Sequence, residues 1–214
     1  MKKLCLVLMI VLISAISYAQ KGSWYIGGVG GYGSHTSDPV NGAKSTSNTW
    51  AVGPEVGTFL ENDIQLGFIL GLNGSTEKNG DNKIAESSNF SPTLYVRKFK
   101  KITDNFSLFS GFYFNYLSGN VKDFVPTEVK TTGSGFGISW GVGAAFALSP
   151  RWTAVGQYGL LGYSSVKFKE DGTETSKESD FNFGVNTVGS SSFVQGNGSG
   201  SVFNIGLYYT FHTN

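Results

Sequence analysis

The sequence predicts an all-β protein, an eight-stranded antiparallel up-and-down transmembrane β-barrel, on three observations. The chain has 214 residues, of which only 14% are charged and 14% are aromatic, and it contains 30 glycines. Globular domains average about 25% charged residues, and interior glycine disfavours long helices. Large apolar residues recur at every second position, and the connecting segments alternate between short and long. A formal net charge of +1 gives no sign of a basic nucleic-acid-binding surface.

Residues 1–19 have the layout of a secretory signal peptide. A short basic segment precedes an apolar run from Leu4 to Ile16, and small residues then lead to a cleavage site at Ala19. A membrane anchor is the alternative, but a spanning helix needs about 20 apolar residues and this run is shorter. We therefore expect export, cleavage after Ala19 and a barrel domain over residues 20–214. Cleavage removes Cys5, the single cysteine, so no disulfide and no cysteine chemistry are expected.

The first four expected strands lie near residues 23–33, 49–60, 64–74 and 88–99. The first is rich in glycine and aromatic residues. In the second and fourth, a charged residue (Glu55 and Arg97) shares one face with small or polar neighbours. In the third, large apolar residues from Ile64 to Leu72 alternate with Gln65 and smaller residues. Alternation with a period of two indicates strands with one apolar face.

The last four expected strands lie near residues 106–118, 135–148, 152–164 and 201–212. Large residues between Phe136 and Leu148 alternate with glycine, serine and alanine, and the pattern returns between Phe203 and Phe211. A soluble sandwich would carry polar, charged residues on its outward face. Side chains this small suit instead the crowded interior of a narrow closed barrel, so we place the large apolar residues against lipid.

Connection lengths support the barrel independently. The short connections are 62–63, 100–105 and 149–151, whereas the long polar ones are 34–48, 75–87, 119–134 and the region after residue 164. Short periplasmic turns and long outer loops are typical of outer-membrane barrels, with both termini in the periplasm. The segment 181–186 also alternates, but a ninth strand would leave the C-terminus on the wrong side. We interpret it as a hairpin above the membrane or a segment folded into the mouth.

The chain resembles the small outer-membrane β-barrel (porin-like) family, of the OmpA/OmpX type, as found in Bacteroidetes-like bacteria. The resemblance rests on the Lys2-Lys3 signal peptide, on Trp24-Tyr25-Ile26-Gly27-Gly28, and on the closing strand Asn204-Ile205-Gly206-Leu207-Tyr208-Tyr209-Thr210-Phe211. It implies that Tyr209 and Phe211 form a C-terminal signal for the barrel assembly machinery. In this chain His212-Thr213-Asn214 follows, whereas the family often ends on the aromatic residue.

The alternation of inward and outward positions along the strands, which we call parity, predicts a polar network inside the barrel. It places Glu55, Gln65 and Arg97 on inward faces near the periplasmic turns. Isolated charges there would be costly unless they are paired, so we expect these three residues to contact one another. The alternative is that Arg97 joins Lys98 and Lys100 as a charge at the rim.

Four candidate sites for other chemistry are not favoured. Residues 28–33 match G-x-G-x-x-G, but no helix follows to hold a pyrophosphate. His35 has serines and Asp38 nearby, but a triad requires geometry that a loop does not supply. His212 is expected at the opposite end, so the two histidines cannot share a metal. The acidic residues between 170 and 180 alternate with lysines, which argues against a calcium site. No cofactor or metal is expected.

Three functions remain open. The first is a structural or surface-interaction role, with loops that meet an extracellular ligand. The second is a narrow pore of low conductance, although eight strands leave little more room than their own side chains fill. The third is a lipid-modifying enzyme, which we do not favour. The expected partners are outer-membrane lipid and the assembly machinery, without nucleic acid, and we expect a monomer.

Overall fold

The computed structural model describes residues 23–38, 44–61, 63–124, 128–170, 172–183 and 204–211. Within these ranges no helix is long and apolar enough to cross a membrane. The strands in chain order are β1 (Trp24–Ser37), β2 (Ser45–Glu61), β3 (Ile64–Asn79), β4 (Asn82–Lys101), β5 (Phe106–Asp123), β6 (Val129–Ala147), β7 (Trp152–Glu170), β8 (Thr173–Phe183) and β9 (Asn204–Phe211).

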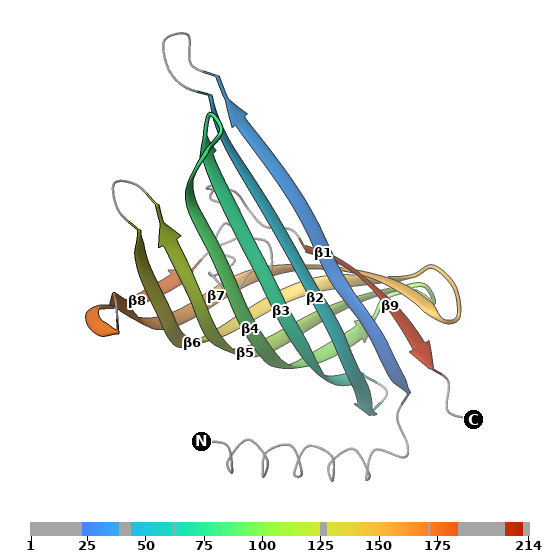
Figure 1. Cartoon of the computed structure of the whole chain (residues 1–214). Coiled ribbons are helices and arrows are strands. Elements are labelled where there is room, and N and C mark those ends of the chain that lie inside the picture. The colour runs from blue at the N-terminus through green and yellow to red at the C-terminus, as the bar shows by residue number, and fades with distance from the viewer. Residues whose placement is uncertain are drawn as a thin grey trace.

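The strands form a closed antiparallel ring (Figure 1). Each strand from β1 to β7 pairs with the next one in the chain, β9 pairs with β7, and β9 pairs with β1. Eight strands, β1 to β7 together with β9, therefore complete the ring. The predicted fold class is confirmed, and each ring strand overlaps the segment expected for it.

The eighth position of the ring is shared by two strands that lie on the same side of β7. β8 pairs with residues 161–170 of β7, and β9 pairs with residues 152–157. The chain turns from β7 into β8 at Gly172, whose φ of 88° lies in the region that favours glycine. Up to Phe183, the alternating segment is thus part of a hairpin that extends β7; residues 184–186 lie outside the described ranges.

The two ends of the ring differ in how the strands are joined. The connection between β2 and β3 and the turns at residues 102–105 and 148–151 lie at one end, which we call the turn end. At the other end, the hairpin end, the polar segments expected to be loops are largely paired strand. β3 continues to Asn79 and β4 begins at Asn82, so only Gly80 and Asp81 connect them. Serine, threonine and asparagine in these segments suggest loops, but cross-strand pairing satisfies their backbone groups equally well in water.

The outward face of the ring is apolar, as predicted. Phe112 and Phe114 are 64% and 52% exposed, whereas Asn115 beside them is 1% exposed. On β9, Ile205 is 65% exposed and Tyr208 5%. Alternation of this kind places large apolar side chains where lipid would contact them and polar side chains inside.

An aromatic layer fills the interior at the turn end. The ring centroids of Tyr25 and Phe59 are 6.1 Å apart, those of Phe59 and Phe99 5.8 Å, and those of Phe99 and Phe109 5.1 Å. Tyr25 and Phe109 are buried. These residues come from four strands, β1, β2, β4 and β5, and they belong to a buried cluster that also includes residues of β6, β7 and β9.

Candidate functional site in the barrel interior

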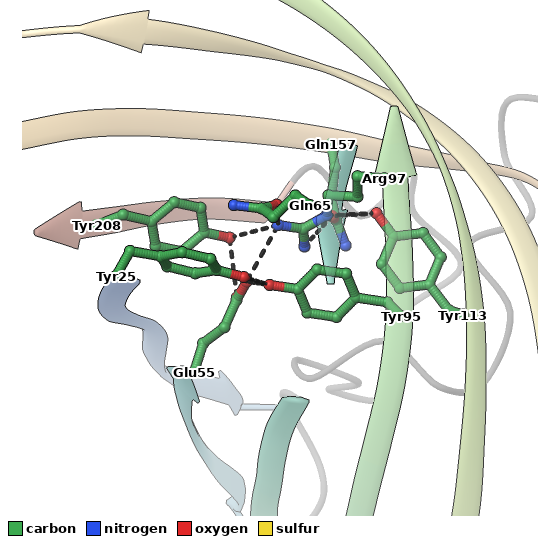
Figure 2. Close-up of polar contacts among 8 residues, drawn as sticks. All are labelled: Tyr25, Glu55, Gln65, Tyr95, Arg97, Tyr113, Gln157 and Tyr208. Carbon is green, nitrogen blue, oxygen red and sulfur yellow. Dashed lines mark hydrogen bonds and ion pairs between the residues drawn. The ribbon is translucent and has the colours of Figure 1, made fainter. Parts of the chain in front are cut away.

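A buried ion pair lies next to the aromatic layer, toward the hairpin end. The guanidinium Nη1 of Arg97 on β4 lies 3.0 Å from Glu55 Oε1 on β2 and donates to Gln65 Oε1 on β3 at 3.2 Å. Arg97 is 1% exposed and Glu55 3%. The three residues predicted from parity are therefore in direct contact, at the centre of the arrangement in Figure 2.

Tyrosine hydroxyl groups surround the Glu55 carboxylate. Tyr208 on β9 donates to Glu55 Oε2 at 2.8 Å and accepts a hydrogen bond from Arg97 Nη1 at 3.0 Å. Tyr95 on β4 donates to Glu55 Oε1, and the hydroxyls of Tyr95 and Tyr25 are hydrogen-bonded to each other. Both oxygens of the carboxylate thus have partners, which a buried charge requires.

The far side of the guanidinium is also satisfied. Arg97 Nε donates to Tyr113 Oη at 2.9 Å, and Nη2 donates to Gln157 Oε1 at 3.1 Å. Tyr113 in turn donates to Gln157 at 3.0 Å. The guanidinium carbon lies 3.9 Å from the ring centroid of Tyr95, within the range of a cation–π interaction. We name this set the Arg97 network: Tyr25, Glu55, Gln65, Tyr95, Arg97, Tyr113, Gln157 and Tyr208.

Glycines on neighbouring strands leave the space that the tyrosine rings occupy. A Cβ atom on Gly67 of β3 would collide with the hydroxyl ends of Tyr95 and Tyr25. A Cβ atom on Gly57 of β2 would collide with Tyr25 as well. The inward glycines of the sequence are therefore spatial partners of the aromatic residues, since a narrow barrel has room for a ring only where the facing residue has no side chain.

The network joins all but one of the ring strands. Its residues come from β1, β2, β3, β4, β5, β7 and β9. A pocket beside it has a volume of about 10 Å³, roughly the room of one water molecule. At this level the interior is thus closed by side chains that are paired with one another.

The other five residues of the Arg97 network follow the same alternation of side chains along the strands. Tyr25, Tyr95, Tyr113, Gln157 and Tyr208 all lie on inward faces by the same alternation that selected the first three residues. Which of them meet across the lumen depends on strand register, which the sequence does not display. Lys98, in contrast, is exposed on the outside and lies 3.8 Å from Asp63, and Lys100 lies on the same outward side of β4.

His35 lies within β1, not in a loop. It pairs in register with Ser47 on β2, and its side chain makes no hydrogen bond or ion pair with another described residue. Ser34 lies on the opposite face of β1. Residues 28–33 are part of the same strand, and the described ranges hold no group of acidic, histidine or cysteine residues that could bind a metal. Ala19 and His212 lie outside the described ranges.

The C-terminal aromatic residues lie on the outward face of β9. The ring centroids of Tyr209 and Phe211 are 5.0 Å apart, and those of Tyr209 and Trp152 on β7 are 5.2 Å apart. Arg151 Nη1 donates to the Tyr209 hydroxyl at 2.9 Å. These residues form an aromatic cluster at the turn end, as is typical of the aromatic bands of membrane barrels at the lipid–water boundary.

Comparison with solved structures finds barrels of the bacterial outer membrane. The translocator domain of the autotransporter NalP from Neisseria meningitidis aligns with a TM-score of 0.46 at 14% identity over 81% of this chain, which spans 64% of that domain. A major outer membrane protein of Thermus thermophilus aligns with a TM-score of 0.40 at 16% identity, over 89% of this chain and 99% of that one. The outer membrane protease OmpT of Escherichia coli aligns with a TM-score of 0.36 at 11% identity, over 89% and 93%.

A comparison of the sequence with known proteins and protein families identifies the family. No curated protein matches the chain. A family model does, however: the model described as the outer membrane protein β-barrel domain matches residues 4–211, which includes all nine strands of the structure. This match, together with the closed ring and its apolar outward face, places the protein in the outer membrane. The chain belongs to the outer membrane protein β-barrel domain family.

Proposed function

We propose that this protein is a closed barrel that does not conduct solutes and has a structural or surface-interaction role at its hairpin end. The observation that carries the proposal is the filled interior. The aromatic layer and the Arg97 network lie one above the other, and the pocket beside the network has a volume of about 10 Å³. A hydrated ion needs a continuous water-filled path, which these layers interrupt. The hairpins then remain as the part that can meet other molecules.

Conductance in planar bilayers tests the closed interior. We expect the purified protein to give no single-channel steps under conditions in which a reconstituted porin, as a positive control, gives them. Steps that persist after the β7–β8 hairpin has been shortened would contradict the proposal and favour the narrow pore. Heat-modifiable gel migration of the same preparation shows that the barrel is folded in each measurement.

The orientation follows from barrel architecture. Membrane barrels of this kind have short periplasmic turns, so we assign the turn end to the periplasm and the hairpin end to the exterior. We further propose that residues 1–19 direct export and are removed after Ala19. The protein then meets the assembly machinery and outer-membrane lipid, and we propose that it remains a monomer.

Phe211 tests the proposed C-terminal assembly signal. Replacing Phe211 with alanine should reduce severalfold the amount of heat-modifiable protein in isolated outer membranes, because the machinery would no longer find the aromatic residue. Ile205→Ala is the matched control, since Ile205 lies on the same outward face of β9 and is 65% exposed. Equal losses in both variants would indicate that only apolar area on β9 matters, not a signal at Phe211.

We propose no catalytic role. His35 is the one histidine in the described ranges, and its neighbours there do not orient it. Cells that express His35→Ala should contain lipid A of the same mass distribution as cells that express the unaltered protein. A lipid A species that is lost with the substitution would restore the lipid-modifying enzyme as the better hypothesis.

A further inference from the structure

A cavity lies in the interior beyond the Arg97 network, toward the hairpin end. Its volume is about 420 Å³, and residues of β2 to β7 line it. This volume lies within the range of about 300–1,000 Å³ found for small-molecule sites. Because the Arg97 network closes the interior between this cavity and the turn end, the cavity is a vestibule without a continuous path to the turn end.

One wall of the vestibule is polar and uncharged. Inward-facing hydroxyl and carboxamide groups come from three adjacent strands: Ser47 and Thr49 on β2, Asn73 and Ser75 on β3, Ser87 and Asn89 on β4. Ser75 and Ser87 share a hydrogen bond of 2.7 Å, and Asn89 Nδ2 donates to Asn73 Oδ1 at 2.9 Å. Hydroxyl and carboxamide groups both donate and accept, so each retains capacity for a further partner.

The opposite wall is mostly apolar, although Ser118 and Asn120 on β5 and Thr131 on β6 also belong to it. Leu117 and Val121 on β5 and Val166 and Phe168 on β7 line it. Gly133 on β6 lies under the Phe168 ring, where an added Cβ would be 3.2 Å from Cε1. The ring can therefore lie close to the backbone of β6 while it contributes apolar surface to the cavity.

The next inward position on β5, on the turn-end side of the vestibule, holds a polar side chain without a hydrogen-bond partner. Asn115 on β5 precedes Leu117 on the same face and pairs in register with Thr93 and Gly137. It is 1% exposed, and neither its amide nitrogen nor its oxygen has a hydrogen-bond partner among the described residues. A buried amide without partners costs free energy; Asn115 itself is not among the residues that line the cavity.

The charges around the cavity exclude several classes of ligand. No lysine or arginine is among its described lining residues, and its two carboxylates are Glu77 and Glu86, of which Glu86 is paired with Lys83, so the lining offers no cation to an anion. The lining strands β3 to β6 are paired on both sides, so their backbone groups cannot bind an added peptide strand. What fits is a neutral molecule with many hydroxyl groups on its rim and an apolar face.

We propose that the vestibule binds a neutral saccharide. The hydroxyl rim of a pyranose would hydrogen-bond to the polar wall on β2 to β4, and its C–H face would pack against Phe168 and the apolar wall. This inference deepens the proposed surface-interaction role and rests on it, because the ligand must arrive at the hairpin end from the exterior.

Saturation-transfer NMR with lactose, maltose and cellobiose tests the proposal. The full-length mature protein is best held in an amine-oxide detergent, since maltoside detergents carry a competing disaccharide. We expect transfer to at least one of the three sugars. Ser87→Trp, which fills the vestibule, should abolish the signal, whereas Ser88→Trp on the outward face of the same strand should retain it. Asn89→Leu should weaken binding by about two- to tenfold, as expected for one lost hydrogen bond.

Each other outcome overturns the inference. Absence of transfer to all three sugars means that the vestibule does not bind neutral saccharides. Equal loss in Ser87→Trp and Ser88→Trp means that the sugar contacts another surface. Stronger binding of lactobionate, the carboxylated analogue of lactose, would exclude a neutral ligand class. Conductance is measured separately, so a protein that binds no sugar and also does not conduct refutes this inference and leaves the closed barrel intact.

Discussion

Replacing Arg97 with alanine should lower the free energy of unfolding by about 3–5 kcal/mol, the usual cost of removing one partner of a buried ion pair. The substitution leaves the Glu55 carboxylate, 3% exposed, without its cation and removes a donor from Gln65, Tyr113, Gln157 and Tyr208. Urea unfolding in lipid vesicles, followed by heat-modifiable gel migration, measures the change. Lys98→Ala is the control, because its ion pair with Asp63 is exposed at 3.8 Å and such pairs contribute about 0–1 kcal/mol.

The double variant Glu55→Ala/Arg97→Ala decides whether the two residues act as a unit. Since the double substitution removes both charges, it should cost less than the sum of the single substitutions. Glu55→Gln provides a milder partner if an alanine variant does not fold, because the amide retains an acceptor for Arg97. Additive effects of Glu55 and Arg97 would refute the network as a source of stability.

Replacing Gly67 with alanine should lower the free energy of unfolding by about 1–3 kcal/mol, the usual cost of overpacking. The added methyl group would collide with the hydroxyl ends of Tyr95 and Tyr25, whose positions are held by Glu55. The rings cannot move away without breaking their hydrogen bonds, so a small substitution acts on the whole network.

Gly30→Ala is the matched control for Gly67. A Cβ atom at Gly30 on β1 would have its nearest neighbour, the carbonyl oxygen of Ala51, at 3.7 Å, an ordinary van der Waals distance. Because alanine restricts the unfolded chain more than glycine does, Gly30→Ala should not lower stability. Both variants are compared by the same urea unfolding in vesicles. If Gly67→Ala proves as stable as the unaltered protein, the close approach of the tyrosines does not limit packing.

The barrel and its faces could be predicted because they depend on alternation alone. Ile205 and Leu207 face outward and Tyr208 faces inward simply because side chains alternate along a strand. The extent of the hairpins was harder to predict, since serine, threonine and asparagine residues occur both in loops and in solvated strands. Nothing local indicates that β3 continues to Asn79 and turns on Gly80 and Asp81. The pairing of β3 with β4 determines where β3 ends.

The sequence by itself determined that the chain forms a barrel, which side chains face inward, and that Glu55, Gln65 and Arg97 share its interior. The tertiary structure alone decided which side chains meet. Tyr208 reaches Glu55 from a position 153 residues away in the chain, because β9 closes the ring against β1 in one register. The alternation of side chains is a local property of each strand, with a period of two. The distances between strands across the lumen, in contrast, are set by the closure of the ring. The filled interior, and the vestibule beyond it, follow from that closure.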